Sequence, residues 1–324
     1  MSGAYVFLDR SQFPEQVRED LLASLRARAI NHKFHYDSYK QAAKWLALHE
    51  AHSPARRDDS CLRIYDDAFQ AAATVVGRGV HVIGLGCGGG QKEARLLELL
   101  GGAAGGLAYT ASDVSLPLVL TAMEAAAGSV SAERRHAVVC DLATTTELGA
   151  ALDGFGETGA RLITLFGIIP NFDPDLLMAR ISALLRPGDV LLLSANLAPG
   201  ADYAAGVRRV LPQYDNELTR DWLLTFLLDL GFEREDGDWC FSIEAAGQDL
   251  QRIAAHFELA RARDVRVHGE NFSFAAGERL RVFFSYRHTR ESMRSLLARY
   301  DIQLRADWIN DSGEEGVFLC RKGA

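Results

Sequence analysis

The sequence predicts an α/β fold with a doubly wound parallel sheet, and three observations support this prediction. Between about residues 80 and 195, short apolar strand patterns alternate with helical patterns, which indicates βαβ crossovers. The first of these strands ends in a glycine cluster, Gly84 to Gly90, and a helical pattern follows at once. The end of the chain has two strand patterns joined by Asn310-Asp311-Ser312-Gly313, which is typical of an antiparallel hairpin.

Hydrophobic periodicity places the individual elements along the chain. The parallel strands are expected at 80–85, 107–112, 136–140, 161–166 and 189–195. The helices between them are expected at 91–100, 115–127, 144–152 and 174–185. Before this block the patterns predict a short strand at 4–8 and helices from Pro14, at 39–50 and at 60–76. After it they predict helices at 203–212, 216–231 and 290–299, and strands at 239–245, 263–268, 271–274, 280–286, 302–308 and 317–321.

Composition limits the classes of function. The 324 residues are 48% hydrophobic and 24% charged, which predicts a globular protein, and the net charge of −8 argues against a nucleic-acid partner. No apolar run is long enough to cross a bilayer and no signal-peptide pattern begins the chain, so we expect no membrane association and a cytoplasmic location. The five cysteines form no C-x-x-C pair, which favours reduced thiols. The oligomeric state stays open.

The glycine cluster predicts a nucleotide-like cofactor. Glycines allow a positive φ and a close approach of the ligand to the backbone, and the following helix N-terminus presents free N–H groups. Asp113 follows the second strand, where a carboxylate can accept both ribose hydroxyls, and Asp141 and Leu142 follow the third, where they can meet an adenine amino group and ring face. The alternative is that Asp113 and Asp141 only cap the helices that follow them.

These features together resemble class I S-adenosylmethionine-dependent methyltransferases, whose sheet ends in an antiparallel hairpin. Within that superfamily the chain is similar to the histidine Nα-methyltransferases of ergothioneine biosynthesis. The similar segments are Tyr36-Asp37, Ser53-Pro54-Ala55-Arg56, Leu85 to Lys92, Ser112 to Ser115, Cys140-Asp141-Leu142, Phe166 to Asn171, Gln213-Tyr214-Asp215 and Phe274 to Glu278.

The resemblance implies roles for residues of this chain. S-adenosylmethionine would be held by Tyr36, Gly86, Gly88, Lys92, Asp113, Asp141 and Leu142. The substrate would be bound by Ser53, Asn171, Tyr214, Phe283 and Ser285. Asn171 and Tyr214 fall where the family holds the amino and carboxylate groups of the substrate, so they are the candidate catalytic residues, acting by positioning. We expect no metal, because the strand ends show no ligand pattern for magnesium.

The resemblance also implies two domains. Residues 20–195 and 289–324 are expected to form the S-adenosylmethionine-binding core. Residues 196–288 are expected to form an inserted α+β domain that recognises the substrate. Residues 1–19 are a candidate addition to that domain, and their assignment stays open.

Two departures from the family bear on the substrate. Phe283 stands where the family has a glutamate for the imidazole ring, and Ser53 stands where the family has a tyrosine. An imidazole N–H facing a phenyl ring would lose a hydrogen bond, at a cost of about 1–3 kcal/mol. The expected reaction is therefore N-methylation of a small amino acid or amine other than histidine. Phe283 as ordinary core packing is an equal alternative.

Three other functions stay open. The first is O- or C-methylation of a small natural-product intermediate, and the second is a non-catalytic module that binds S-adenosylmethionine. A nicotinamide-dependent oxidoreductase is the weakest of the three, because the chain shows neither a second nucleotide-binding half nor a catalytic Tyr/Lys pair.

Overall fold

The structure is a computed structural model that describes residues 5–53, 58–101, 106–247 and 249–323. The described chain forms two compact units. The first unit comprises the segments up to Gln12, from residue 58 to Leu197, and from His288 onward; the second comprises Phe13–Ser53 and Ala198–Arg287. The chain therefore leaves the first unit twice and returns to it twice.

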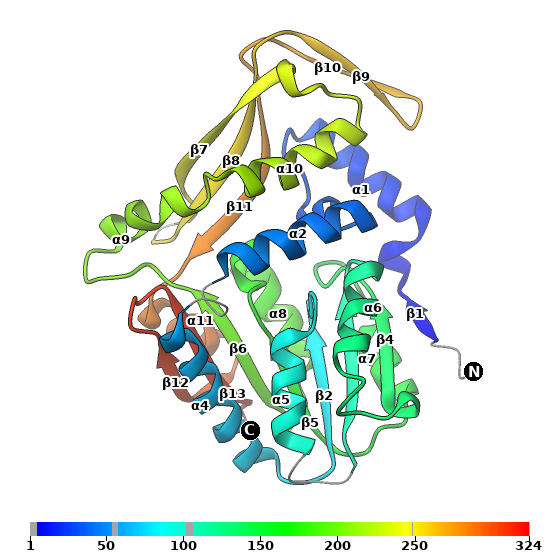
Figure 1. Cartoon of the computed structure of the whole chain (residues 1–324), viewed down its shortest axis with the longest axis vertical. Helices are drawn as coiled ribbons and strands as arrows, with labels where there is room; N and C mark the ends of the chain where they lie inside the picture. The colour runs from blue at the N-terminus through cyan, green and yellow to red at the C-terminus, as the bar shows by residue number, and fades with distance from the viewer. Residues whose placement is uncertain (1–4, 54–57, 102–105, 248, 324) are drawn as a thin grey trace. The chain divides into compact units, whose positions relative to one another are not determined.

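The first unit is built on an eight-stranded sheet with the order β1-β4-β3-β2-β5-β6-β13-β12. Its strands are β1 (Val6–Leu8), β2 (Val80–Leu85), β3 (Ala108–Asp113), β4 (Arg135–Val139), β5 (Ala160–Leu165), β6 (Val190–Asn196), β12 (Ile302–Ile309) and β13 (Glu315–Lys322). The strands from β1 to β6 pair in parallel, and β13 pairs antiparallel with both β6 and β12. This arrangement confirms the predicted doubly wound sheet with its terminal hairpin (Figure 1).

Helices cover both faces of this sheet (Figure 1). One face packs against α4 (Asp59–Val76), α5 (Gln91–Gly101) and α6 (Leu116–Ala125). The other packs against α7 (Leu148–Gly154), α8 (Pro174–Leu184) and α11 (Arg290–Arg299). Along β2, Val80 and Val82 join the first core while Ile83 and Leu85 join the second, as the alternation of side chains along a strand requires.

The second unit contains a three-stranded antiparallel sheet, β11-β8-β7, and a separate hairpin of β9 and β10. Its strands are β7 (Gly237–Ala245), β8 (Gln251–Leu259), β9 (Arg263–Val267), β10 (Glu270–Phe274) and β11 (Arg279–Arg287). Its helices are α1 (Pro14–Arg26), α2 (Tyr39–His52), α9 (Tyr203–Val210) and α10 (Glu217–Asp229). An aromatic core that includes Phe34, Trp222, Phe226, Phe257 and Phe283 holds these elements together.

The N-terminal boundary between the units differs from the predicted one. Residues 13–53 belong to the second unit, whereas we expected residues 20–53 in the core. The reason is a set of contacts with β11: Ile30 N–H donates to Arg281 O at 2.8 Å, and His35 Nε2 bonds Val282 O at 2.6 Å. The segment before Phe13 stays in the first unit because β1 pairs with β4.

Strand β8 is the element that the sequence patterns missed. Its run Ile253-Ala254-Ala255 has no polar alternation, because the strand lies between β7 and β11 and all three residues are fully buried. A continuous apolar run fits a strand and a helix equally well, so only the pairing with β7 and β11 identifies this segment as a strand.

Candidate functional site

The glycine turn of the first unit is closely packed against the protein around it. Gly86 and Gly90 have φ values of 62° and 73°, in the left-handed region that glycine adopts without strain. A Cβ on Gly90 would lie 2.6 Å from the Cα of Ala122, and one on Gly86 would lie 2.6 Å from a side-chain carbon of Ile168. The turn therefore packs against its surroundings with no room for a side chain.

Asp113 fixes this turn from the end of β3. One of its carboxylate oxygens accepts from Gly88 N–H at 3.0 Å and the other accepts from Ser115 N–H at 3.0 Å. Burial raises the pKa of Asp113 to about 6, against the hydrogen bonds that stabilise the carboxylate. Ser115, not Asp113, caps α6. Each carboxylate oxygen has two lone-pair sites, so Asp113 retains capacity for the hydroxyl groups of a ribose.

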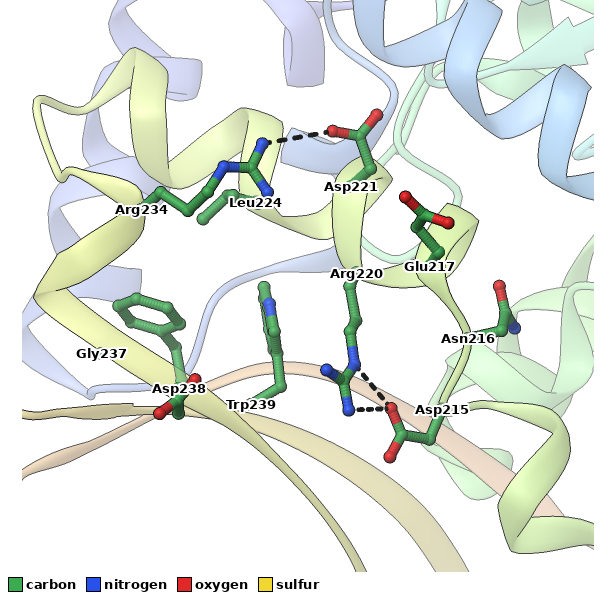
Figure 2. Close-up of a pocket in the computed structure, with 11 residues that line it drawn as sticks. Asp215, Asn216, Glu217, Arg220, Asp221, Leu224, Arg234, Gly237, Asp238 and Trp239 are labelled. Atoms are coloured by element: carbon green, nitrogen blue, oxygen red, sulfur yellow. Dashed lines mark hydrogen bonds and ion pairs between the residues drawn. The ribbon is translucent and has the colours of Figure 1, made fainter.

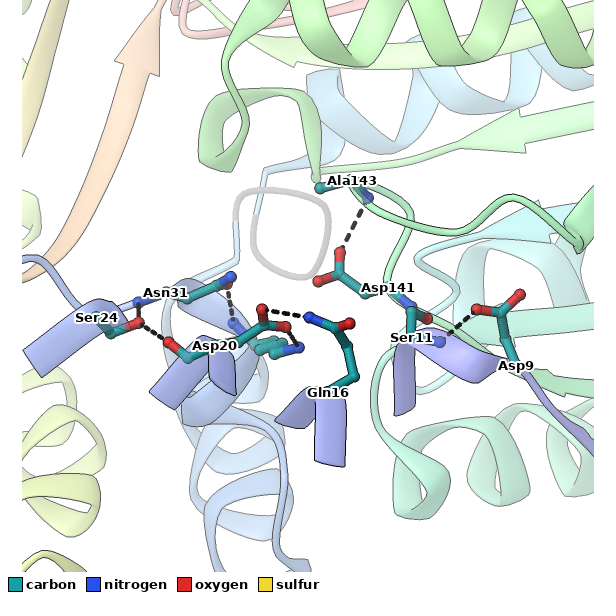
Figure 3. Close-up of polar contacts among 9 residues, drawn as sticks. Asp9, Ser11, Gln16, Asp20, Ser24, Asn31, Asp141 and Ala143 are labelled. Atoms are coloured by element: carbon teal, nitrogen blue, oxygen red, sulfur yellow. Dashed lines mark hydrogen bonds and ion pairs between the residues drawn. The ribbon is translucent and has the colours of Figure 1, made fainter. Parts of the chain in front are cut away.

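Asp141 occupies the equivalent position after β4. Its backbone N–H donates to Ser11 Oγ at 2.9 Å, and its carboxylate accepts from Ala143 N–H at 2.9 Å (Figure 3). Asp9 supports this arrangement because it accepts from Ser11 N–H and from the Thr145 hydroxyl. Helix α7 begins only at Leu148, so Asp141 does not cap it. Leu142, the predicted cover for an adenine ring, lies beside it and is 9% exposed.

Lys92 and Asn171 complete the predicted residues of the first unit. Lys92 is the second residue of α5, and its ammonium donates to Tyr65 OH at 2.6 Å and lies 3.5 Å from the Glu315 carboxylate. Asn171 ends a short 3-10 helix (Ile169–Asn171) just after β5 and is half-buried. Sequence patterns did not identify Tyr65 and Glu315, because they lie on α4 and at the start of β13, far from Lys92 in the sequence.

In the second unit, Tyr214 and Ser285 lie together. The Tyr214 hydroxyl is 2.8 Å from Ser285 Oγ and accepts from Arg287 Nη2 at 2.7 Å. Ser285 is 1% exposed and Arg287 is 5% exposed. The sequence predicted the first two residues, and the arginine is the partner that it missed. Arg287 follows Ser285 by two positions on β11, so the two side chains share one face of the strand.

Phe283 lies on the same strand inside the aromatic core. Its ring centroid is 4.9 Å from that of His32, 5.8 Å from that of Trp222 and 6.2 Å from that of Tyr214. Burial lowers the pKa of His32 well below its ordinary value and that of His35 to about 4. Both imidazoles are therefore neutral at pH 7. Phe283 thus packs in the core and also contacts the predicted substrate residue Tyr214.

Tyr36 and Ser53 also belong to the second unit. The Tyr36 ring packs against Trp45 and Trp222, with centroid distances of 5.8 and 5.5 Å. Ser53 follows the last residue of α2, and its N–H donates to His49 O. The rest of the similar motif, Pro54-Ala55-Arg56, lies outside the described residues. Tyr36 and Phe283 pack on the same side chain, Trp222.

A cavity of about 610 Å³ lies in the second unit, between the start of α10 and the start of β7 (Figure 2). Trp239 and Phe257 supply aromatic surface, and Asp215 and Arg220 form an ion pair at its edge. None of the predicted site residues lines it. The cavity is therefore separate from the predicted substrate residues.

The described residues contain neither a metal-ligand cluster nor a membrane-spanning helix. No group of His, Cys, Asp and Glu side chains there has the arrangement of a metal site. Across the same residues, no helix combines the length and apolar character needed to span a membrane.

Comparisons with solved structures returned distant matches. An S-adenosylmethionine-dependent methyltransferase from Clostridium acetobutylicum is 15% identical, with 87% of this chain and 99% of that chain covered and a TM-score of 0.46. The 1,6-didemethyltoxoflavin-N1-methyltransferase from Burkholderia thailandensis is also 15% identical, with 88% and 89% covered and a TM-score of 0.43. No curated protein matches the chain.

The family model is the decisive comparison. A model described as a histidine-specific, S-adenosylmethionine-dependent methyltransferase matches residues 16–322, nearly the whole chain. The strand order, with its antiparallel β13 between β6 and β12, agrees with the sheet expected for such an enzyme. The chain belongs to this family and is an S-adenosylmethionine-dependent methyltransferase.

Proposed function

We propose that this enzyme methylates the nitrogen of a small amino acid or amine. The observation that carries the proposal is the cluster of the half-buried Tyr214 with the buried Ser285 and Arg287. In it the Tyr214 hydroxyl lies 2.8 Å from Ser285 Oγ and 2.7 Å from Arg287 Nη2. Hydroxyl and guanidinium donors are the groups that recognise a carboxylate. A small molecule with a carboxylate and an amine fits this chemistry.

The first unit supplies the proposed cofactor residues. Gly86 and Gly88 expose backbone to the cofactor, and Asp113 accepts hydrogen bonds from its ribose hydroxyls. Asp141 accepts from the adenine amino group, and Leu142 covers one face of the ring. Lys92 is proposed to meet the cofactor's carboxylate, and Tyr36 of the second unit is a further cofactor residue by resemblance alone.

Methyl transfer requires the protein mainly to align the acceptor nitrogen with the methyl group. Bound S-adenosylmethionine supplies an activated methyl group, so the chain's own task is to orient the acceptor nitrogen and to exclude water. Asn171 is proposed to hold the acceptor's amino group. Tyr214 is proposed to hold its carboxylate. The nitrogen must lose a proton before it attacks, and we propose positioning rather than proton transfer as the role of both side chains.

Phe283 bears on which acceptor is used. The family model is described as histidine-specific, and histidine is therefore the reference acceptor. In this chain, however, Phe283 packs with Trp222 and Tyr214, and a phenyl ring offers no partner to an imidazole N–H. We propose an acceptor with an apolar or aromatic side chain in preference to histidine.

The test is incubation with S-adenosylmethionine that carries a trideuterated methyl group, with a panel of amino acids and amines that includes histidine. Mass spectrometry of each product locates the label. The proposal expects the label on nitrogen, with an aromatic or aliphatic amino acid preferred over histidine. A label on oxygen or carbon would rule out N-methylation. A preference for histidine would contradict the proposal that Phe283 disfavours histidine as the acceptor. Cofactor binding without turnover of any acceptor would favour a non-catalytic module.

A further inference from the structure

A buried polar network crosses the first unit at Tyr65, whose ring lies on the inner face of α4 and is 3% exposed. The Tyr65 hydroxyl donates to the Glu315 carboxylate at the start of β13 and accepts from the Lys92 ammonium at 2.6 Å. Lys92 also stacks over the Tyr65 ring, with Nζ 4.4 Å from its centroid. Three elements distant in sequence, α4, α5 and β13, therefore meet at one hydroxyl group.

The loop that follows β5 lies next to this network. It ends at Asn171, and its Gly167 N–H donates to Ser194 Oγ of β6 at 3.0 Å. The Phe166 ring, at the start of this loop, packs on Tyr65 with centroids 5.5 Å apart. The root of the Asn171 loop is thus linked to Tyr65 by ring packing.

The hydrogen bonds of Tyr65 leave Lys92 with capacity for a further acceptor. Tyr65 donates to Glu315 and accepts from Lys92. The Lys92 ammonium has three hydrogens, and Tyr65 and Glu315 account for two of them. The third hydrogen is the one that a cofactor carboxylate can take. The Glu315 carboxylate holds the Lys92 ammonium in place and leaves its third hydrogen available for another acceptor.

Structural support alone is a poor explanation for this network. A buried ion pair is commonly matched or exceeded in stability by apolar side chains of similar volume. Lys92 lies next to the glycine turn, and Phe166, which packs on Tyr65, lies just before the root of the Asn171 loop. These are the two places where, under the proposed function, cofactor and acceptor are held.

We propose that Tyr65 is a positioning residue: held by Glu315, it sets the Lys92 ammonium for the cofactor carboxylate and, through the packing of Phe166 on its ring, couples cofactor binding to the order of the 167–171 loop. This inference rests on the proposed roles of Lys92 and Asn171. It adds that the two sites are linked within the first unit through one side chain.

The test is a double-mutant cycle on cofactor affinity. S-adenosylmethionine is titrated by calorimetry into the full-length wild type, Tyr65→Phe, Lys92→Met and the double variant. Tyr65→Phe is expected to weaken binding about tenfold, as for the loss of one well-placed charged hydrogen bond. In the Lys92→Met background the same substitution is expected to have no further effect. Equal effects in both backgrounds would show that Tyr65 does not act through Lys92 and would overturn the proposal.

Asp66→Asn is the matched control. Asp66 is the next residue on α4, and its ion pair with Arg95 also joins α4 to α5, but on the exposed surface. This variant is expected to bind within twofold of wild type. A tenfold loss in the control would mean that any weakening of the α4–α5 contact affects the cofactor, which would also overturn the proposal.

The link to the loop is tested by hydrogen exchange of residues 165–172 with and without S-adenosylhomocysteine. Ligand-induced protection is expected in wild type and Asp66→Asn. It is expected to be lost in Phe166→Leu, which removes the ring that packs on Tyr65 but leaves Tyr65, Lys92 and Glu315 intact. This experiment also tests the coupling if Tyr65→Phe does not fold. Unchanged protection in Phe166→Leu would contradict the coupling. If wild type itself binds no S-adenosylmethionine, the assigned cofactor site fails, and that result is distinct from an additive cycle.

Discussion

The two units hold their predicted residues in different ways. In the first unit, backbone N–H groups fix the key side chain: Asp113 accepts from Gly88 and Ser115 at the end of a parallel strand. In the second, other side chains do so: Tyr214 is held by Ser285 and Arg287 beside an aromatic core. A site fixed by backbone follows from strand order, whereas a site fixed by side chains depends on packing between distant segments.

The largest expected difference in stability is between alanine substitutions of one glycine from each unit. Gly90→Ala should lower the free energy of unfolding by about 2–5 kcal/mol, because a left-handed φ is combined with a 2.6 Å approach to the Ala122 backbone. Gly277→Ala should cost only about 1–2 kcal/mol, because its φ is also positive but nothing lies within 4 Å of its Cβ position. Urea denaturation of both variants measures the two losses in the free energy of unfolding. Equal losses would show that the glycine turn is not as tightly packed as described.

Acid should act on the second unit through His35. The unfolded chain binds this proton near the ordinary pKa of 6.5, whereas the folded chain binds it only near 4 because the ring is buried. The unfolded state thus holds more protons between these values, and stability falls as pH drops from 6.5 to 4, by at most about 3 kcal/mol from this residue. His35→Gln should reduce the slope of unfolding free energy against pH.

Phe34→Leu is the control for that experiment. It disturbs the same core from the neighbouring position without removing a titrating group, so it should lower stability by a similar amount at every pH. If His35→Gln shifts the whole curve without changing its slope, the buried neutral histidine is not a source of acid lability.

A smaller effect is expected for Tyr214→Phe. Loss of the hydroxyl removes its contacts with Ser285 and Arg287 and should cost about 1–3 kcal/mol of stability. It should also raise the KM for the best acceptor of the panel about tenfold with little change in cofactor affinity. Tyr203→Phe is the matched control, because Tyr203 OH bonds Arg287 O and Gln251 N–H in the same unit. A similar rise in KM for both variants would remove the assigned role of Tyr214.

The sequence predicted much of the first unit because each inference there rested on local patterns. Strand periodicity located β2 to β6, and Asp113 and Asp141 followed from their positions after two of those strands. Tyr65 and Glu315 were missed for a physical reason: their partner Lys92 is distant in sequence, and only the folded sheet brings β13 beside α4.

The second unit was harder to predict. Its expected N-terminal boundary was wrong for residues 20–53 because those residues bind β11 through Ile30 and His35, and no local pattern encodes that contact. Ser285 and Tyr214 were chosen by resemblance. Their proximity was then found in the structure, together with the unforeseen partner Arg287.

The most direct test of the account is the pH dependence of S-adenosylmethionine binding. The pKa of Asp113 is raised to about 6 by burial, and its ionised form is the stronger acceptor for the ribose hydroxyls. Below pH 6 the dissociation constant should therefore rise, by up to about tenfold per pH unit, while it stays constant above pH 7. In Asp113→Asn binding should be weaker and this dependence absent. A wild-type affinity that does not change between pH 5 and 7, or the same pH profile in Asp113→Asn, would contradict the assignment of Asp113 to the cofactor.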